Sequence, residues 1–357
     1  MDTLTHALSG ALLARATAPK SPRADQLPRR LRMLVGFLVA MIPDSDVIFS
    51  FIDPLTYLAV HRGVTHSIIL LPVWAVGLAY LFSLISRRRY PWKAFVGVCM
   101  LGIAIHIVGD VITAFGTMIL APVSMWRLAI PTTFILDRYF TGIIVAGLIA
   151  SAIWKNSRTP ALASLAILVS YVGFQAVLLG RAVAAGHEYI AAQNLQGARA
   201  HAIPHPLSPF NWMVIVEQQK AYRLAYVNLL RNEPVPEPVN ASWLQRLRAS
   251  YRPVKDAEWQ EVARYGTDER EEKLVRDGWK ADVLARYRDF ALFPALYRVD
   301  RNSRHVCVWF QDLRFRVRER AMPFRYGVCR GNTDSYWTAY RFPDVDDVAK
   351  WLERIPD

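Results

Sequence analysis

The sequence predicts an α-helical polytopic membrane domain followed by a small soluble α+β domain with an antiparallel sheet. Residues 1–180 contain 15 Lys and Arg, seven Asp and no Glu, whereas residues 181–357 contain 28 Lys and Arg and 23 acidic residues. Long apolar runs fill the first part, and apolar and polar residues alternate in short runs of the second. We therefore predict a membrane-embedded helical domain over 1–180 and a soluble, mainly β domain over 181–357.

The membrane domain is expected to hold about five to six helical segments, because a spanning helix needs ~20 mainly apolar residues. Runs of suitable composition occur at 1–18, 34–52, 67–86, 94–122, 139–154 and 160–180. Pro43-Asp44-Ser45-Asp46 interrupts one of these runs, and His106 and Asp110 lie inside another. We expect some of the segments to be re-entrant for this reason.

Positive charges in the first half lie in short segments between apolar runs, at 19–33, 87–93 and 155–159. Such segments are typical of cytoplasmic loops. This places everything after Gly180 on the opposite side, so the C-terminal domain is predicted to be extracytoplasmic. The same distribution predicts the lipid bilayer as the partner and argues against nucleic acid, since no separate basic stripe is present.

The second half is expected to contain a hairpin, a charged helical region and four further strands, at 211–230, 243–288, 292–299, 306–315, 325–330 and 335–342. Cys307 and Cys329 would form a disulfide if this domain is exported, and would stay thiols in the cytoplasm. Asp312 and Arg314 alternate on an expected strand and are predicted to form a surface ion pair, which contributes little to stability.

Four short segments of the first half combine His and Asp in a way that indicates chemistry. They are Asp2-Thr3-Leu4-Thr5-His6, Pro43-Asp44-Ser45-Asp46, His61-Arg62-Gly63-Val64-Thr65-His66 and His106-Ile107-Val108-Gly109-Asp110. Ionisable groups at membrane depth are costly unless they find partners, and they therefore indicate function.

The spacing within these segments favours convergence. His106 and Asp110 are four residues apart, which places them on one face of a helix. Asp44 and Asp46 follow a proline, which ends the preceding helix and lets both carboxylates turn into a cavity.

The third segment needs a loop to bring its histidines together. His61 and His66 are five residues apart across Gly63, so they do not share one regular helical face. A loop leading into the 67–86 helix would let both converge, with Thr65 or Ser67 capping that helix.

Neutral imidazole and carboxylate are the ligands of zinc-type sites, so the segments predict one or two divalent metal ions, with Zn²⁺ as the expected metal. The predicted metal ligands are His6, Asp44, His66, His106 and Asp110. The predicted catalytic residues are Asp46 and His61, as general base or as support for a ligand, and Arg62, as a grip on an anionic group. Together they predict a membrane-bound hydrolase that cleaves an ester or phosphoester of a lipid-like molecule.

Two other classes of function fit the same residues. One is a non-catalytic metal-binding membrane anchor that presents the C-terminal domain to a partner, and the other is a proton-coupled transporter. A transporter built from inverted repeats would show internal symmetry, and none is evident in the sequence. The anchor predicts that loss of the ligands harms only folding, whereas the enzyme predicts loss of metal and activity in a folded protein.

The four motifs also resemble a known family. Met-Asp-x-x-Thr-His, Pro-Asp-x-Asp, His-Arg-Gly-x-Thr-His-Ser and His-x-x-x-Asp follow one another in this order within apolar helices. In this the chain is similar to the YdjM-like family of bacterial inner-membrane proteins, which are regarded as metal-dependent hydrolases. The resemblance covers roughly residues 1–180 and implies a location in the bacterial inner membrane.

A more distant likeness concerns the number of metal ions. The order His6, Asp44, His66, His106, Asp110 is similar to that in zinc-dependent phospholipase C and P1-type nucleases. The chain departs from those enzymes because it lacks an N-terminal Trp and a later His-x-x-x-Glu motif. One or two metal ions are therefore expected rather than three.

Overall fold

The computed structural model describes residues 1–21, 23, 25–51, 53–318, 320, 322–332, 334 and 336–343, and the chain divides into two compact units. The first unit comprises Met1–Phe51, Val60–Gly180 and Pro206–Pro209. The second comprises the described residues of Ile52–Ala59, Arg181–His205 and Phe210–Asp357. An N-terminal helical region precedes a C-terminal sheet region, so the predicted fold class is confirmed. The predicted boundary at residue 180 falls within a helix, and the division at that residue stays a prediction.

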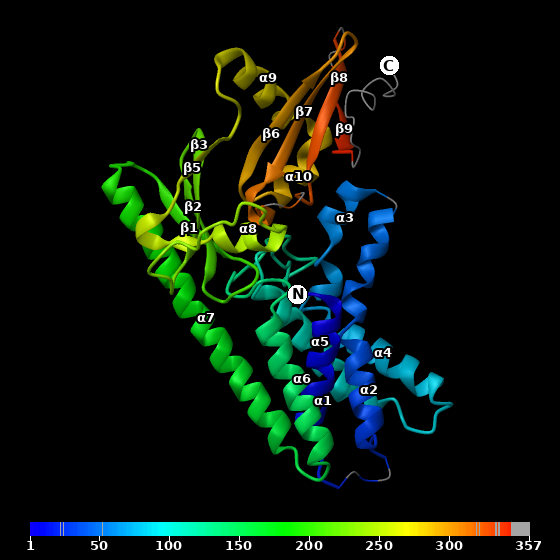
Figure 1. Cartoon of the computed structure of the whole chain (residues 1–357). Coiled ribbons are helices and arrows are strands. Elements are labelled where there is room, and N and C mark those ends of the chain that lie inside the picture. The colour runs from blue at the N-terminus through cyan, green and yellow to red at the C-terminus, as the bar shows by residue number, and fades with distance from the viewer. Residues whose placement is uncertain are drawn as a thin grey trace. The chain divides into compact units, whose positions relative to one another are not determined.

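The helices of the N-terminal half run from blue to green in Figure 1 and are α1 (Thr3–Ala16), α2 (Arg29–Val39), η1 (Ile42–Phe51), α3 (Pro54–Val60), η2 (Val64–His66), α4 (Leu71–Ile85), α5 (Lys93–Val111), α6 (Arg138–Ile153) and α7 (Thr159–Ala192). Within the described residues, three stretches are long and apolar enough to cross a membrane: Arg29–Phe51, Lys93–Val111 and Thr159–Ala192. A fourth is possible if the bent pair Pro54–His66 and Leu71–Ile85, with a 79° bend, forms one broken span.

The interrupted segments take different forms in the structure. α2 ends at Val39 and the 3-10 helix η1 begins at Ile42, because Pro43 lacks the N–H that would bond to the Val39 carbonyl oxygen if the α-helix continued. The run predicted at 94–122 is helical only as far as Val111. The segment that follows, up to α6, is irregular apart from a single bridge between Thr117 and Leu128.

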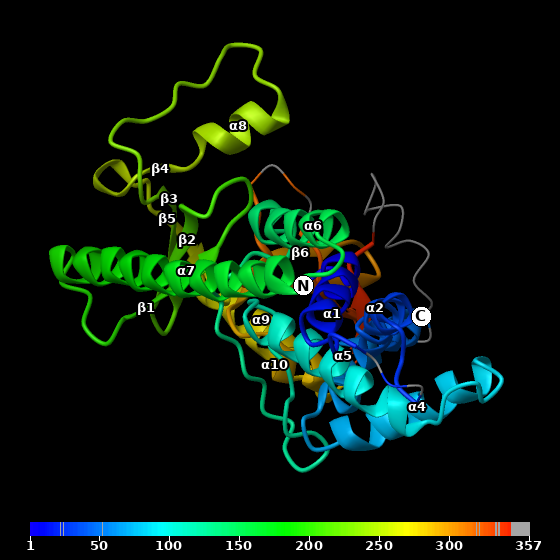
Figure 2. The ribbon, with the colours of Figure 1, turned by 90° about the horizontal axis from the view of Figure 1, so that it is seen from below.

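α1, α2 and α5 pack side by side and form the centre of the helical unit (Figure 2). The first two meet at glycines: a Cβ added to Gly10 would lie 2.2 Å from the carbonyl oxygen of Gly36. Such close backbone approach is possible only without a side chain. α1 runs antiparallel to the other two, so its N-terminus lies beside the C-terminal ends of α2 and α5.

Short polar side chains stabilise the N-terminal ends of two helices and one turn in this unit. Asp2 caps α1 by accepting from Thr5 N at 3.0 Å, and Asp137 caps α6 in the same way. Ser67 Oγ accepts from the amides of Ile69 and Leu70 at 3.1 and 3.2 Å, just before α4. Ser67 thus stabilises the turn that leads into α4 but does not cap the helix, whose N-cap is Leu70, so the expected cap by Thr65 or Ser67 is wrong.

The C-terminal half forms two sheets. The first contains β1 (Arg199–Pro204), β2 (Asn211–Glu217), β3 (Ala221–Asn228), β4 (Arg252–Pro253) and β5 (Gln260–Ala263), and the second contains β6 (Pro294–Arg301), β7 (His305–Asp312), β8 (Tyr326–Gly331) and β9 (Thr338–Arg341). All pairings are antiparallel except β3 with β4. The helices of this half are α8 (Trp243–Ala249), α9 (Glu269–Lys280) and α10 (Ala285–Phe290).

Two details of the second half differ from the sequence prediction. The region 243–288, predicted to be helical, also contains β4 and β5, because edge residues there pair with β3. The ion pair of Asp312 and Arg314 is buried rather than exposed, at 0% and 6% exposure, since the end of β7 is covered by Phe290 and Phe315. Cys307 and Cys329 are cross-strand partners on β7 and β8 and are joined by a disulfide.

Candidate metal centre

Four side chains from three segments converge at the end of the helical unit where α1 begins. They are Asp44 on η1, His66 on η2, and His106 and Asp110 on α5. One ligand atom from each lies within 4.8 Å of all the others. Three of the side chains are fully buried, and Asp44 is 15% exposed. Sequence reasoning predicted all four as metal ligands.

The distances among these atoms suit a small metal ion. The two Nε2 atoms of His66 and His106 are 2.9 Å apart, and Asp110 Oδ2 lies 3.0 and 3.4 Å from them. Asp44 Oδ1 lies 3.9 and 3.5 Å from the same nitrogens. In a tetrahedral zinc site with ligand distances near 2.0–2.1 Å, neighbouring ligand atoms are about 3.3 Å apart. The observed distances that involve the histidine nitrogens, 2.9–3.9 Å, lie on both sides of that value.

Each histidine is fixed in the tautomer that a metal ligand needs. His106 Nδ1 is 2.7 Å from the carbonyl oxygen of Ala40, which can only accept, so Nδ1 carries the proton. Thr65 Oγ1 donates to Asp46 Oδ2 at 2.9 Å and therefore accepts from His66 Nδ1 at 2.8 Å. Both Nε2 atoms consequently present a lone pair to the same point.

The carboxylate of Asp110 lacks a hydrogen-bond donor on the side that faces the two histidines. Its Oδ2 is fully buried and accepts no hydrogen bond from any described residue. Buried carboxylate oxygens are normally paired. Two imidazole lone pairs and two carboxylate oxygens facing one another repel unless a cation lies among them. The chemistry of the donor set therefore fits a divalent metal ion.

The other oxygen of Asp110 is fully occupied. Asp110 Oδ1 accepts from the α-amino group of Met1 at 2.5 Å and from Arg62 Nη2 at 2.9 Å. His6 Nε2 lies 3.0 Å from the same oxygen, and the His6 ring stacks on His106 with centroids 3.7 Å apart. His6 thus joins the cluster, but its predicted role as a metal ligand stays a prediction.

Arg62 lies inside the cluster instead of at its surface. The residue is 2% exposed, adopts a left-handed backbone with φ of 60°, and donates to Thr113 Oγ1 at 2.9 Å. Its guanidinium also lies 4.7 Å from the centroid of Phe115. In this arrangement the Arg62 charge compensates that of Asp110, and its predicted grip on an anionic group stays a prediction.

Asp46 and His61 form a separate pair beside the four ligands. Asp46 Oδ1 is 2.6 Å from His61 Nδ1, and Asp46 Oδ2 accepts from Arg62 N at 3.2 Å. A carboxylate that accepts from Nδ1 leaves Nε2 as the basic nitrogen of the imidazole, as a general base requires. Asp46 also orients His66 through Thr65, so one carboxylate positions two histidines.

Some contributors to the centre have no signal in the sequence. The Ala40 carbonyl that fixes His106 is a backbone group, and its position depends on the packing of α2 against α5. Thr3 donates to Asp44 Oδ2 at 2.8 Å and turns Oδ1 towards the histidines. Thr65 was expected to act only as a helix cap, but it links Asp46 to His66.

Comparison with known proteins places this centre in a family. Residues 1–182 match the family described as YdjM inner membrane protein. The uncharacterized protein YfhP of Bacillus subtilis (strain 168) is 28% identical over 186 residues, which cover 50% of this chain and 54% of the relative. The chain thus spans about half the length of that curated relative. No solved structure shows a significant match. Because the match covers all four motifs and more than half of the sequence, the chain belongs to the YdjM family of inner membrane proteins.

Proposed function

We propose that the protein is a membrane-bound, metal-dependent hydrolase that cleaves an ester or phosphoester of a lipid-like substrate. The observation that carries the proposal is the convergence of two Nε2 lone pairs and two carboxylate oxygens, one of which has no hydrogen-bond donor. Asp44, His66, His106 and Asp110 would hold the ion, with Zn²⁺ as the metal that best suits two imidazoles and two carboxylates.

Three further residues of the chain would support the reaction at the metal ion. When bound, a divalent ion of this kind activates a water molecule and polarises a carbonyl or phosphoryl oxygen. His61 would accept a proton at Nε2, and Asp46 would hold the ring in that tautomer and stabilise its charged form. Arg62 would keep Asp110 ionised, because its guanidinium contacts Oδ1.

Exposure around the centre supports a lipid-like substrate. Asp44 is the one member of the four that is not fully buried, so solvent or substrate would reach the centre from the side of η1. On that helix Val47, Ile48 and Phe51 are 48%, 61% and 85% exposed. Since η1 belongs to a stretch apolar enough to lie in a membrane, a substrate would reach Asp44 along an apolar surface.

The C-terminal domain is proposed to be extracytoplasmic. Two observations support this placement: the disulfide between Cys307 and Cys329, which is stable in oxidising compartments, and the basic loops on the other side of the predicted spans. Reactivity of these cysteines towards a membrane-impermeant thiol reagent in intact cells, with and without prior reduction, tests it.

Metal content is the decisive measurement. The full-length protein in detergent is analysed by elemental mass spectrometry, beside His106→Ala, Asp44→Asn and the control His187→Ala, which changes an exposed histidine of α7. We expect one or two metal ions per chain in the wild type and control, on the order of a tenfold loss in the other two, and an unchanged elution volume. The loaded proteins are then assayed on phosphodiester and carboxylic ester lipids.

Each outcome separates the classes of function. Metal and hydrolysis lost together in a folded variant support the hydrolase. Metal bound without hydrolysis of any ester supports the non-catalytic anchor. A wild type that takes up no metal even after supplementation overturns the proposal and favours a proton pathway through the same residues.

A further inference from the structure

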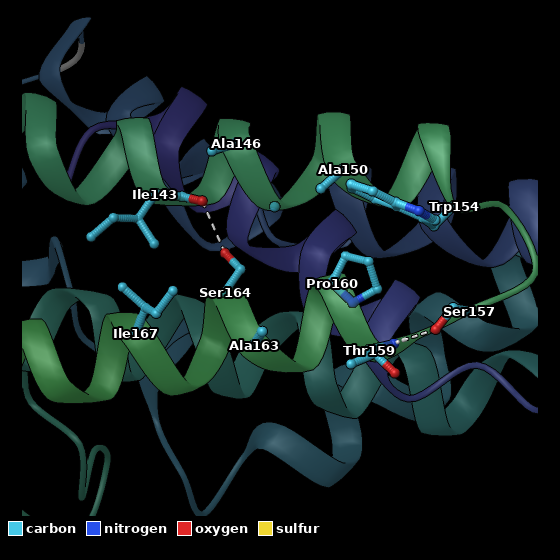
Figure 3. Close-up of a pocket in the computed structure, with 11 residues that line it drawn as sticks. Ile143, Ala146, Ala150, Trp154, Ser157, Thr159, Pro160, Ala163, Ser164 and Ile167 are labelled. Carbon is cyan, nitrogen blue, oxygen red and sulfur yellow. Dashed lines mark hydrogen bonds between the residues drawn. The ribbon is translucent and has the colours of Figure 1, made fainter.

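A groove between α6 and α7 lies away from the metal centre. It has a volume of about 600 Å³, and Figure 3 shows its walls, which are formed mainly by Ile143, Ala146, Gly147, Ala150, Trp154, Pro160, Ala163 and Ile167. Ser164, in the middle of the groove, donates its hydroxyl to the carbonyl oxygen of Ile143 at 2.9 Å. The interior therefore offers no unpaired hydroxyl there and suits an apolar chain.

One end of this groove is positively charged. The loop after α6, which includes Trp154 and Ser157 of the groove wall, also carries the exposed Lys155 and Arg158. Arg15 Nη2 donates to the carbonyl oxygens of Lys155, at 3.1 Å, and Ser157, and Arg29 Nη1 donates to that of Lys155. Two cationic residues therefore lie on the loop at one end of the groove, and two more bind the carbonyl oxygens of that loop.

No negative charge balances these cations within the part of the chain that the structure describes. None of the four is joined to a carboxylate by an ion pair there. Arg15 is also only 3% exposed. Its charge is held beneath the loop by the carbonyl oxygens of Lys155 and Ser157, and an anion beside the exposed Lys155 and Arg158 would offset the local excess of positive charge.

We propose that the groove binds an anionic phospholipid, with an acyl chain along the groove formed by α6 and α7 and the phosphate at the exposed Lys155 and Arg158, where Arg15 and Arg29 add positive charge. Basic pockets between membrane helices are suited to anionic headgroups, and Trp154 has the amphipathic ring that favours the headgroup level. The site is distinct from the metal centre: His6 and Arg15 are nine residues apart on α1, which separates the two sites by about 14 Å along that helix.

Lipid retention tests the proposal. The full-length protein in detergent is titrated with dioleoyl phosphatidylglycerol or dioleoyl phosphatidylcholine, and bound lipid is counted by native mass spectrometry. Lys155→Ala/Arg158→Ala removes two charges from the groove. The matched control Arg89→Ala/Lys93→Ala removes two charges from another basic segment at 87–93, which does not line the groove. Ala150→Phe fills the groove, and Val169→Phe adds the same ring at a 73% exposed position of α7 outside it.

We expect the wild type to retain phosphatidylglycerol over phosphatidylcholine. Because each basic side chain near an anionic headgroup contributes a factor of roughly five, Lys155→Ala/Arg158→Ala is expected to weaken retention by about tenfold or more. Ala150→Phe is expected to do the same, and both controls to stay near wild type. Equal retention of the two lipids, equal effects of variant and control, or a change of oligomeric state in Ala150→Phe in place of lipid loss would overturn the proposal.

Discussion

Two buried aspartates, one in each unit, show how a structural carboxylate differs from a candidate ligand. Asp312 and Asp110 are both fully buried, and each contacts an arginine. Asp312 Oδ2 accepts from Arg314 Nε and Nη2 at 2.9 and 2.6 Å, and its Oδ1 accepts from Arg314 N at 3.0 Å. Asp110 has donors on Oδ1 only, and its Oδ2 faces two imidazole lone pairs.

The difference lies in the balance of donors and acceptors. Around Asp312 every carboxylate oxygen meets an N–H group, so the pair is complete as it stands. Around Asp110 the acceptors outnumber the donors, and the excess acceptors all point to one place. A complete pair contributes to stability, whereas an incomplete one indicates a site for a cation.

The largest expected effect is on the complete pair. Asp312→Ala leaves Arg314 buried without its carboxylate and should lower the free energy of unfolding by about 3–5 kcal/mol. Urea titration of the full-length protein in detergent, followed by near-UV circular dichroism, measures it. The control is Glu261→Ala, which removes an exposed partner of Arg223 and should cost less than about 1 kcal/mol. Equal losses in the two variants would mean that burial does not distinguish these pairs.

The next largest expected effect is the stabilisation of the protein by a metal ion bound at the cluster around Asp110. Saturating Zn²⁺ should stabilise the wild type by about 2.7 kcal/mol when the free ion is at 100 times its dissociation constant. Asp44→Asn should lose most of that gain yet keep the stability of the metal-free protein, because an amide N–H can donate to the His106 lone pair, 3.5 Å away in the present structure. Thermal unfolding with Zn²⁺ or with chelator measures both quantities. A metal-free Asp44→Asn protein that is strongly destabilised would instead assign Asp44 a structural role.

The sequence predicted the four residues of this cluster but not the excess of hydrogen-bond acceptors over donors among them. The i, i+4 spacing of His106 and Asp110 and the proline before Asp44 are local signals, and helix geometry translates them directly into position. The tautomer of His106 depends on the Ala40 carbonyl, which tertiary packing brings near and which has no side-chain signal.

The same limit applies to the sheets. Alternation predicted β6 to β9 well, but the short β4 and β5 owe their existence to pairing with β3. Their own composition contains Pro253 and charged residues, which a strand prediction disfavours. Asp312 and Arg314 likewise follow the predicted alternation, but the aromatic rings that bury them come from distant parts of the chain.

A smaller effect tests how the cluster is held in place. Thr65→Val removes the hydroxyl that links Asp46 to His66 while all four ligands stay, and it should weaken metal affinity by about 10–100-fold. Competition with a fluorescent zinc chelator measures the affinity. Thr17→Val changes an exposed threonine just beyond the other end of α1 and should leave the affinity unaltered. If Thr65→Val binds as tightly as the wild type, the tautomer of His66 is not set by this hydroxyl.

The smallest expected effect is a pH dependence in the second unit, where His205 forms another complete pair. Its Nδ1 lies 3.0 Å from the Tyr251 hydroxyl, and burial lowers the pKa of His205 to about 3. The folded protein therefore keeps this imidazole neutral, while the unfolded chain takes up a proton below a pKa of about 6.5, so stability falls as the pH falls. The loss should be about 0.7 kcal/mol from pH 7 to 6 and about 2 kcal/mol by pH 5. Urea titrations of the wild type and His205→Gln over this range measure it, with a shallower slope expected in the variant. Parallel slopes would show that His205 also takes up its proton in the folded state, so that burial beside Tyr251 does not keep the imidazole neutral.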